Sequence, residues 1–74
     1  MATKGMIYVP EINVDVFKTD ADNHGVKIEL LEVDYFENYV FDAEGEALND
    51  SDWIEHLEAN GIEVSVYSEI LELL

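Results

Sequence analysis

Apolar and polar residues alternate along three stretches of the chain, and this period of two predicts β-strands. The first stretch runs from Ile12 to Phe17 and the last from Ile62 to Tyr67. Between them, Val26 to Val33 alternates until the adjacent pair Leu30 and Leu31 shifts the pattern, which predicts a β-bulge there. A fourth apolar stretch, Met6 to Val9, ends at the only proline, so we expect a short edge strand or an extended lead-in there.

The segment between residues 34 and 41 fits two structures. Asp34 and Glu37 have the spacing of a capping box, which would start a helix with an apolar stripe of Tyr35, Phe36, Tyr39 and Val40. The alternative is a hairpin in which residues 39–41 pair with residues 46–48 and Gly45 takes the left-handed position of the turn. We favour the hairpin.

One helix is predicted after this segment. Residues 49–52 supply candidates for its N-cap, and Gly61 suits its C-terminal cap. Trp53, Ile54 and Leu57 form an apolar stripe, so we expect Trp53 to pack in the core. Acidic residues at three-residue spacing form a ridge on the same helix: Asp52, Glu55 and Glu58.

These elements predict one α+β domain over residues 1–74, with a small antiparallel sheet of four to five strands and one helix packed on a face. Their expected order is β-β-β-β-α-β. The polar residues from Asp20 to Gly25 predict a turn between two strands, with Gly25 at positive φ. Residues 69–74 form a short apolar tail, for which we expect either a continuation of the sheet or a last helical turn. A chain of this length has room for a single core.

The net charge of the chain indicates which kinds of partner it can bind. Eighteen acidic residues face three lysines and no arginine, for a formal charge of −15, so most carboxylates must point into solvent. A net charge of about 2–8 already keeps a small domain soluble, and a larger one destabilises the compact state. Direct binding to nucleic acid or to an anionic membrane needs Lys and Arg, so both are disfavoured. The implied partner is a basic protein.

Residues that could support catalysis or metal binding are few. The chain has no cysteine, which excludes a disulfide, a thiolate zinc site and a cysteine nucleophile, and fits a cytoplasmic protein. Asp20 to Gly25 begins like a calcium loop, but Leu31 stands where the bidentate Glu is required. We expect a plain polar turn there, with a weak cation site as the alternative. His24, His56 and three serines form no catalytic motif, so we expect no enzyme, cofactor or metal.

The acidic residues are densest between residues 29 and 58, a stretch without Lys or Arg. Outward residues on a strand recur every ~6.6 Å, and helix residues three apart are separated by ~4.5 Å along the axis. Two such elements side by side approach the charge density of duplex DNA, which carries one charge per ~1.7 Å. We expect residues 42–46 and the helix ridge to form one continuous patch. The predicted partner-binding residues are Glu29, Glu32, Asp34, Glu37, Asp42, Glu44, Glu46, Asp50, Asp52, Glu55 and Glu58.

Small size, extreme acidity, the lack of cysteine and a compact α+β pattern together resemble the DNA-mimic inhibitors that phages and mobile elements direct against host defences, anti-CRISPR and antirestriction proteins among them. The resemblance covers the whole chain, is compositional and assigns no residue roles. It implies a non-enzymatic inhibitor that occupies the DNA-binding surface of a CRISPR effector complex, restriction enzyme or nuclease. A phage-encoded protein of this kind would act in the host cell cytoplasm, as a monomer or homodimer. The alternative is an acidic interaction module that binds a basic partner without mimicry.

Overall fold

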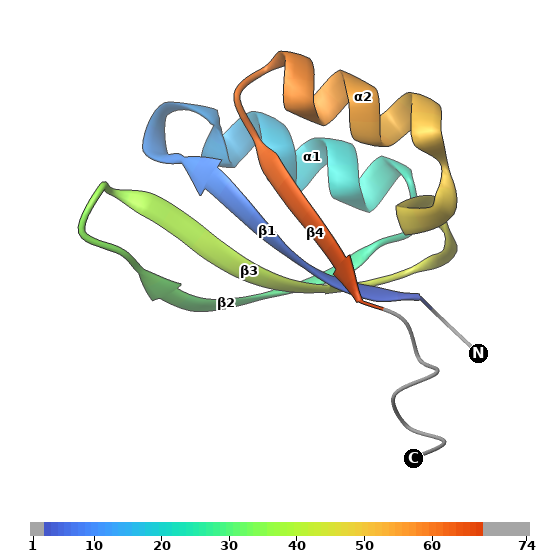
Figure 1. The fold of residues 1–74 in the computed structure, drawn as a ribbon, viewed down its shortest axis with the longest axis horizontal. Coiled ribbons are helices and arrows are strands. Elements are labelled where there is room, and N and C mark those ends of the chain that lie inside the picture. The colour runs from blue at the N-terminus through green and yellow to red at the C-terminus, as the bar shows by residue number, and fades with distance from the viewer. Residues whose placement is uncertain (1–2, 68–74) are drawn as a thin grey trace.

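The computed structural model describes residues 3–67, which form a four-stranded antiparallel sheet with two helices on one face (Figure 1). Two short 3-10 turns, η1 and η2, precede the helices. The predicted α+β class with a small antiparallel sheet is confirmed. The elements in chain order are β1 (Lys4–Pro10), η1 (Glu11–Asn13), α1 (Val14–Asn23), β2 (Lys27–Val33), β3 (Asn38–Glu44), η2 (Glu46–Asn49), α2 (Ser51–Ala59) and β4 (Glu63–Tyr67).

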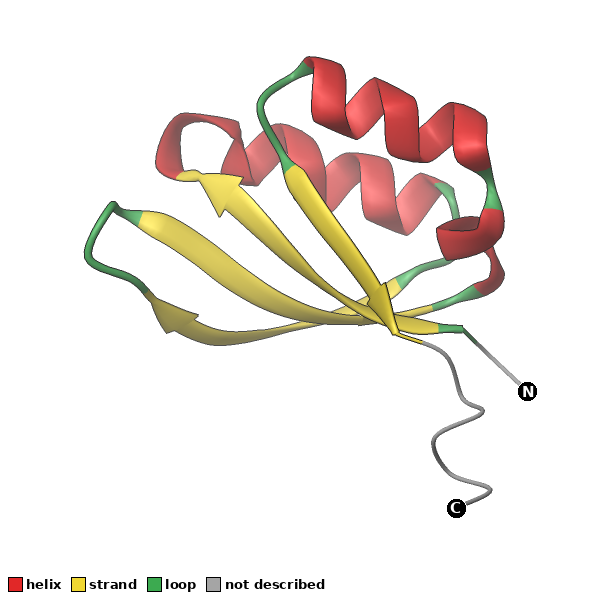
Figure 2. Cartoon of the chain, in the orientation of Figure 1, coloured by secondary structure: helices red, strands yellow, loops and turns green. Residues whose placement is uncertain are grey.

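The strands lie in the order β2-β3-β1-β4, so β1 and β3 are central and β2 and β4 are the edges. The β-α-β-β-α-β sequence of elements with this order is the split βαβ arrangement. Each helix connects two strands that flank a third strand. Both helices lie on the same side of the sheet, and no helix among residues 3–67 covers its other face (Figure 2).

The predicted strand over Ile12 to Phe17 is wrong, because η1 and the start of α1 occupy these residues. Val14 and Phe17 are buried with Ala21, at helical spacings of three and four, whereas Ile12 is exposed. Alternation over six residues fits both a strand and the first turns of such a helix, which is why the local pattern misled. The predicted order β-β-β-β-α-β is therefore wrong as well, because the order is β-α-β-β-α-β. The prediction of a single helix is wrong because α1 accompanies α2.

The predicted edge position of Met6 to Val9 is also wrong. These residues belong to β1, which pairs with β3 on one side and β4 on the other. Pro10 is the last residue of the strand, where its missing N–H does not interrupt the ladder, and it leads into η1. Proline therefore marks the end of a central strand.

Neither structure predicted for residues 34–41 is formed. β3 runs without a break, and Gly45 follows it in extended conformation, with φ of 164°. The hairpin turn lies earlier, between β2 and β3. One carboxylate oxygen of Asp34 accepts hydrogen bonds from the backbone N–H groups of Phe36 and Asn38, both at 2.9 Å. Glu37 takes the left-handed conformation, with φ of 61°. An Asx turn at Asp34 thus sets the hairpin.

Both helices end in the same glycine-dependent cap. After α1, the N–H of Gly25 donates to Asp22 and the N–H of Val26 to Ala21. The corresponding bonds after α2 run from Gly61 and from the residue that follows it. These are Schellman motifs, whose left-handed position favours glycine, and the φ angles are 70° at Gly25 and 80° at Gly61. The positive φ of Gly25 is confirmed. Residues 20–23, predicted as a turn, form the last turn of α1.

Two further predictions are confirmed. The register of β2 against β3 shifts between Leu30 and Glu32, where the bulge was expected. The N-cap of α2 is Asp50, whose carboxylate accepts a hydrogen bond from the N–H of Asp52 at 3.0 Å. The prediction for residues 69–74 lies outside the described residues.

The core fills the space between the sheet and the two helices. Its largest fully buried side chains include Phe17 of α1, Phe41 of β3 and Leu57 of α2, and the two phenyl rings lie 5.3 Å apart between centroids. Trp53 is buried with them, as predicted. Among residues 3–67 no polar or charged residue is fully buried. Each large apolar side chain buried in this way stabilises the fold by roughly 1.5–3 kcal/mol relative to exposure.

Gly5 provides a test of how closely β1 and β4 approach. A Cβ atom at this position would lie 2.9 Å from the carbonyl oxygen of Ser65 and 3.2 Å from the Cα atom of Val66. Because both are backbone atoms, β4 would have to shift. We expect Gly5→Ala to lower the unfolding free energy by ~1–3 kcal/mol in urea denaturation. Ser65→Ala is the control and should stay within ~0.5 kcal/mol of the parent. Equal stability of Gly5→Ala and the parent would contradict the close approach.

Candidate protein-binding surface

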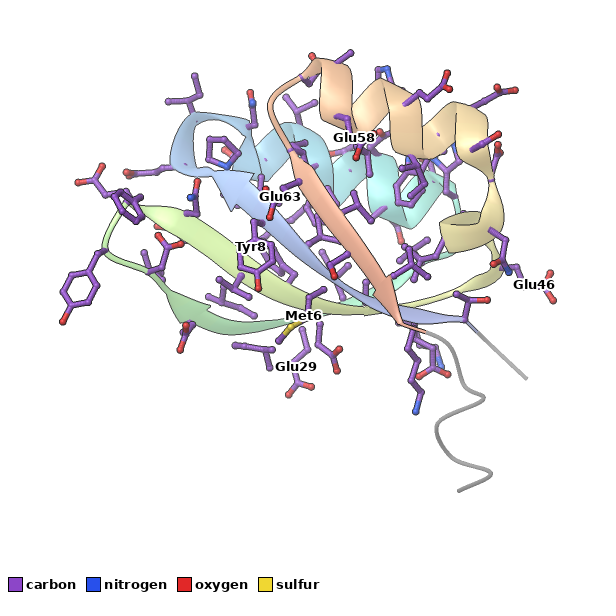
Figure 3. The ribbon with its side chains drawn as sticks, viewed as in Figure 1. Met6, Tyr8, Glu29, Glu46, Glu58 and Glu63 are labelled. Atoms are coloured by element: carbon purple, nitrogen blue, oxygen red, sulfur yellow. The ribbon has the colours of Figure 1, made fainter. Side chains whose placement is uncertain are left out.

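The sheet face that carries no helix, here termed the open face, arranges its side chains in rows across the strands (Figure 3). Ile7 and Val9 of β1 are buried under the helices, so Met6 and Tyr8 point to the open face. Acidic residues lie toward the edges of the rows. Between them the half-buried side chains of Met6 and Tyr8 form an apolar strip, whereas the neighbouring Val40 is buried, with 3% exposure. From β2 to β4, the strand pairing gives one row of Glu29, Asp42, Met6 and Ser65, and a second row of Glu32, Val40, Tyr8 and Glu63.

A third row gives the open face an uneven charge. It places Lys27 of β2, Glu44 of β3 and Lys4 of β1 opposite one another. Two of the three lysines of the chain therefore lie at the end of the face where β2 begins. Glu29 and Glu32 lie nearer the hairpin, in rows that contain no lysine. The negative charge of the open face is therefore strongest beside these two residues.

The ridge of α2 lies on the other side of the molecule. Asp52, Glu55 and Glu58 are exposed on this helix, which covers the face of the sheet opposite to Glu29 (Figure 3). Asp42 belongs to the open face, and Glu46 lies on η2 at one end of the sheet. The expected continuous patch from residues 42–46 to the ridge is therefore not formed. The sheet and its core separate two acidic surfaces.

Two of the eleven predicted residues stabilise the chain locally. Asp34 holds the hairpin turn and Asp50 caps α2, as described above. Asp34 and Asp42 are half-buried. Glu37 is exposed at the hairpin tip. The exposed members of the set, which can meet a partner without rearrangement, are Glu29, Glu32, Glu37, Glu44, Glu46, Asp50, Asp52, Glu55 and Glu58.

Asp20 has a structural role that the sequence did not reveal. Its carboxylate accepts a hydrogen bond at 3.0 Å from the indole Nε1 of Trp53, on α2. The imidazole of His24 stacks on this indole, with ring centroids 4.9 Å apart, and its Nδ1 lies 3.4 Å from the same carboxylate. His56 Nε2 lies 3.6 Å from it. A buried Trp requires an acceptor for its N–H, but only the packing of α1 on α2 selects Asp20.

The calcium-like stretch from Asp20 to Gly25 is helical up to Asn23, so it has no loop that could wrap around an ion. Within residues 3–67 no group of three or more His, Cys, Asp or Glu side chains is arranged to hold a metal. A groove of about 420 Å³ runs between α1 and α2 beside Asp20, whose carboxylate is engaged by Trp53. Its lining residues are Asp15, Val16, Thr19, Asp20, Asn23 and His56.

The sequence also predicts that Tyr35, Tyr39 and Tyr67 pack in the core with their hydroxyls at the rim. This is wrong for Tyr35, because Tyr35 and the adjacent Phe36 are almost fully exposed at the hairpin tip. Tyr39 does pack against the core. The side chain of Tyr67 lies outside the described part of the structure. The sequence offered a signal for the exposed pair, since both residues follow Asp34, a turn former.

Comparison of the chain with protein-family models, with curated proteins and with solved structures gives no match. Neither helix in the described part of the chain has the length and hydrophobicity needed to cross a bilayer.

The contact between Asp20 and Trp53 leads to a stability prediction. Asp20→Ala removes the acceptor of a buried indole N–H, so we expect the unfolding free energy to fall by ~1–3 kcal/mol. Asp20→Asn keeps an acceptor oxygen and should recover most of this loss. Urea denaturation followed by Trp53 fluorescence measures both. Equal losses for Asn and Ala would show that the hydrogen bond contributes nothing.

Proposed function

We propose that this chain is a non-enzymatic inhibitor that binds the basic, nucleic-acid-binding surface of a host-defence protein and blocks access of DNA. A CRISPR effector complex is the first target to test, followed by restriction enzymes and nucleases. The observation that carries the proposal is that exposed carboxylates stand in the last turns of both helices, where helix electrostatics makes a negative charge unfavourable.

The helix ends illustrate this cost. The last turn of a helix favours cations, because the backbone carbonyls there carry partial negative charge. The last turn of α1 contains Asp22 and no basic residue, and Glu58 lies in the last turn of α2. Each unfavourable placement costs typically ~0.3–1 kcal/mol at an exposed site. The stability of the fold does not explain why acidic residues occupy these last turns, whereas attraction to a basic partner would explain it.

The spacing of the acidic residues supports mimicry of a DNA strand. Glu29 and Asp42 are directly opposite on neighbouring strands, which places their Cβ atoms ~4.5–5.5 Å apart. Successive residues of the α2 ridge are ~4.5 Å apart along the helix axis. These spacings are of the same order as the ~3.4 Å axial separation of charges along one DNA strand. Arginine-rich targets are favoured because guanidinium pairs bidentately with carboxylate.

The apolar strip of the open face favours a second candidate function. Met6 and Tyr8 lie between acidic residues and are half-buried. A DNA-binding groove contacts mainly phosphates and sugars, so an apolar strip would contribute little to binding there. An amphipathic basic protein surface would contact both the strip and the acids. In that case the chain is an acidic interaction module without mimicry, and DNA would not compete for its partner.

The proposed function predicts a strong dependence of binding on salt. Exposed charges are screened over shorter distances as ionic strength rises, so raising NaCl from about 50 mM to about 500 mM should weaken binding to a purified CRISPR effector complex by more than roughly tenfold. Calorimetry at each salt concentration measures the affinity. Unchanged affinity would indicate an apolar interface and would contradict mimicry.

Charge reversal on the α2 ridge tests where the target binds. We expect Glu55→Lys with Glu58→Lys to weaken binding more than roughly tenfold and to relieve DNA competition, with stability within ~0.5 kcal/mol of the parent. The control, Glu11→Lys with Asp15→Lys, makes the same charge change on exposed positions of η1 and α1. Asp20 is unsuitable for the control because it contacts Trp53, and Asp22 is unsuitable because its position is itself attributed above to the partner. Loss of binding in the control variant alone would place the contact surface at the start of α1.

A further inference from the structure

One edge of the sheet is available for pairing with another chain. β2 pairs with β3 on one side, and no strand among residues 3–67 pairs with its other side. Its side chains Leu30, Leu31 and Val33 are 49%, 47% and 51% exposed. An exposed apolar edge strand is a template for adding a further strand. The bulge after Leu30 leaves Lys27–Leu30 as the regular stretch in which such pairing would begin.

A groove beside this edge could receive side chains from an added strand. It has a volume of about 560 Å³ and lies between α1 and β2, on the helix side of the sheet. Leu30 lines it and remains half exposed, so this apolar wall is only partly covered by the chain itself. The full lining is Lys18, Asp22, Val26, Lys27, Ile28, Leu30 and Phe41.

The other face of the same edge is acidic. Glu29 and Glu32 are exposed on β2 and point to the open face, since they pair with Asp42 and Val40. Side chains of an added strand would alternate between this acidic face and the groove. We propose that the β2 edge binds an extended segment of a partner protein in which apolar and basic residues alternate. The apolar side chains enter the groove, and the basic side chains lie beside Glu29 and Glu32.

A second copy of the chain fits this edge poorly. Each copy carries a formal charge of −15. Antiparallel pairing of two β2 strands would bring the Glu29 and Glu32 side chains of both copies to the same edge, and like charges on adjacent strands are destabilising. Opposite charges at such positions are stabilising. Charge complementarity therefore selects a basic segment as the occupant. Lys18 and Lys27 disfavour a basic residue at the start of β2, which limits the basic positions to the stretch beside Glu29 and Glu32.

The inference shares with the proposed function only the need for a basic partner. Its test uses a capped synthetic peptide of alternating Val and Lys, titrated into the isotope-labelled protein at about 150 mM NaCl. A peptide with the same residues in two blocks, all Val and then all Lys, is the control. We expect amide chemical-shift changes to be concentrated in residues 27–33. The affinity of the alternating peptide should be at least roughly tenfold higher than that of the block peptide, because only alternation places Val in the groove and Lys beside Glu29 and Glu32. Equal affinities, or shifts spread over α2, would overturn the proposal.

Paired charge variants give a second measurement. Glu29→Lys with Glu32→Lys should weaken binding of the alternating peptide by roughly tenfold, because opposite charges across the edge are replaced by like charges. Glu55→Lys with Glu58→Lys makes the same charge change on α2 and should alter it less than roughly threefold. Equal effects of the two double variants would overturn the proposal. A dimer detected by light scattering, with β2 amides protected from hydrogen exchange, would also overturn it, because a second copy of the chain would then occupy the edge. The spectrum of each variant verifies its fold. DNA competition is not involved, so this test and that of the proposed function can fail separately.

Discussion

Burial of one sheet face beneath two helices is the constraint on which the rest of this structure depends. The chain carries far more negative than positive charge, and within residues 3–67 no polar or charged residue is fully buried. Repulsion among the carboxylates therefore has to be opposed by an apolar core built from Phe17, Phe41, Leu57 and their neighbours. Glycine at position 5 lets β4 lie close against β1, which completes the floor of that core.

The same constraint forces the acidic residues outward in two directions. On the sheet they can only face away from the helices, and on the helices they can only face away from the sheet. The open face and the α2 ridge are consequently separate acidic surfaces. A target that wraps around the protein would use both, and a target with a single basic groove would use one. Asp20 is the exception among the carboxylates, because it joins the two helices through Trp53.

The edge of β2 combines features that are separate elsewhere on the molecule. Its backbone has no strand partner on one side in the described residues, its apolar side chains border a groove, and Glu29 and Glu32 line its other face. The neighbouring hairpin tip exposes Tyr35 and Phe36 on a turn held by Asp34. Rigid aromatic side chains of this kind often contribute strongly to binding. Partner contacts at this end of the molecule would combine backbone pairing, apolar burial and charge.

Features signalled by local patterns of residues could be predicted before the fold was known. These are the α+β class, the bulge in β2, the positive φ of Gly25, the extent of α2 and the burial of Trp53. Tertiary structure alone decided that β1 is central, that Ile12 to Phe17 begins a helix, that β3 continues past residue 41 and that the acids of β3 and α2 lie on opposite sides. Caps are fixed by hydrogen bonds within about five residues, and the bulge is marked by a local break in the two-residue alternation at Leu30 and Leu31, so both can be recognised in the sequence. Strand order and helix docking are fixed by contacts between distant residues, and a six-residue apolar pattern satisfies more than one such arrangement.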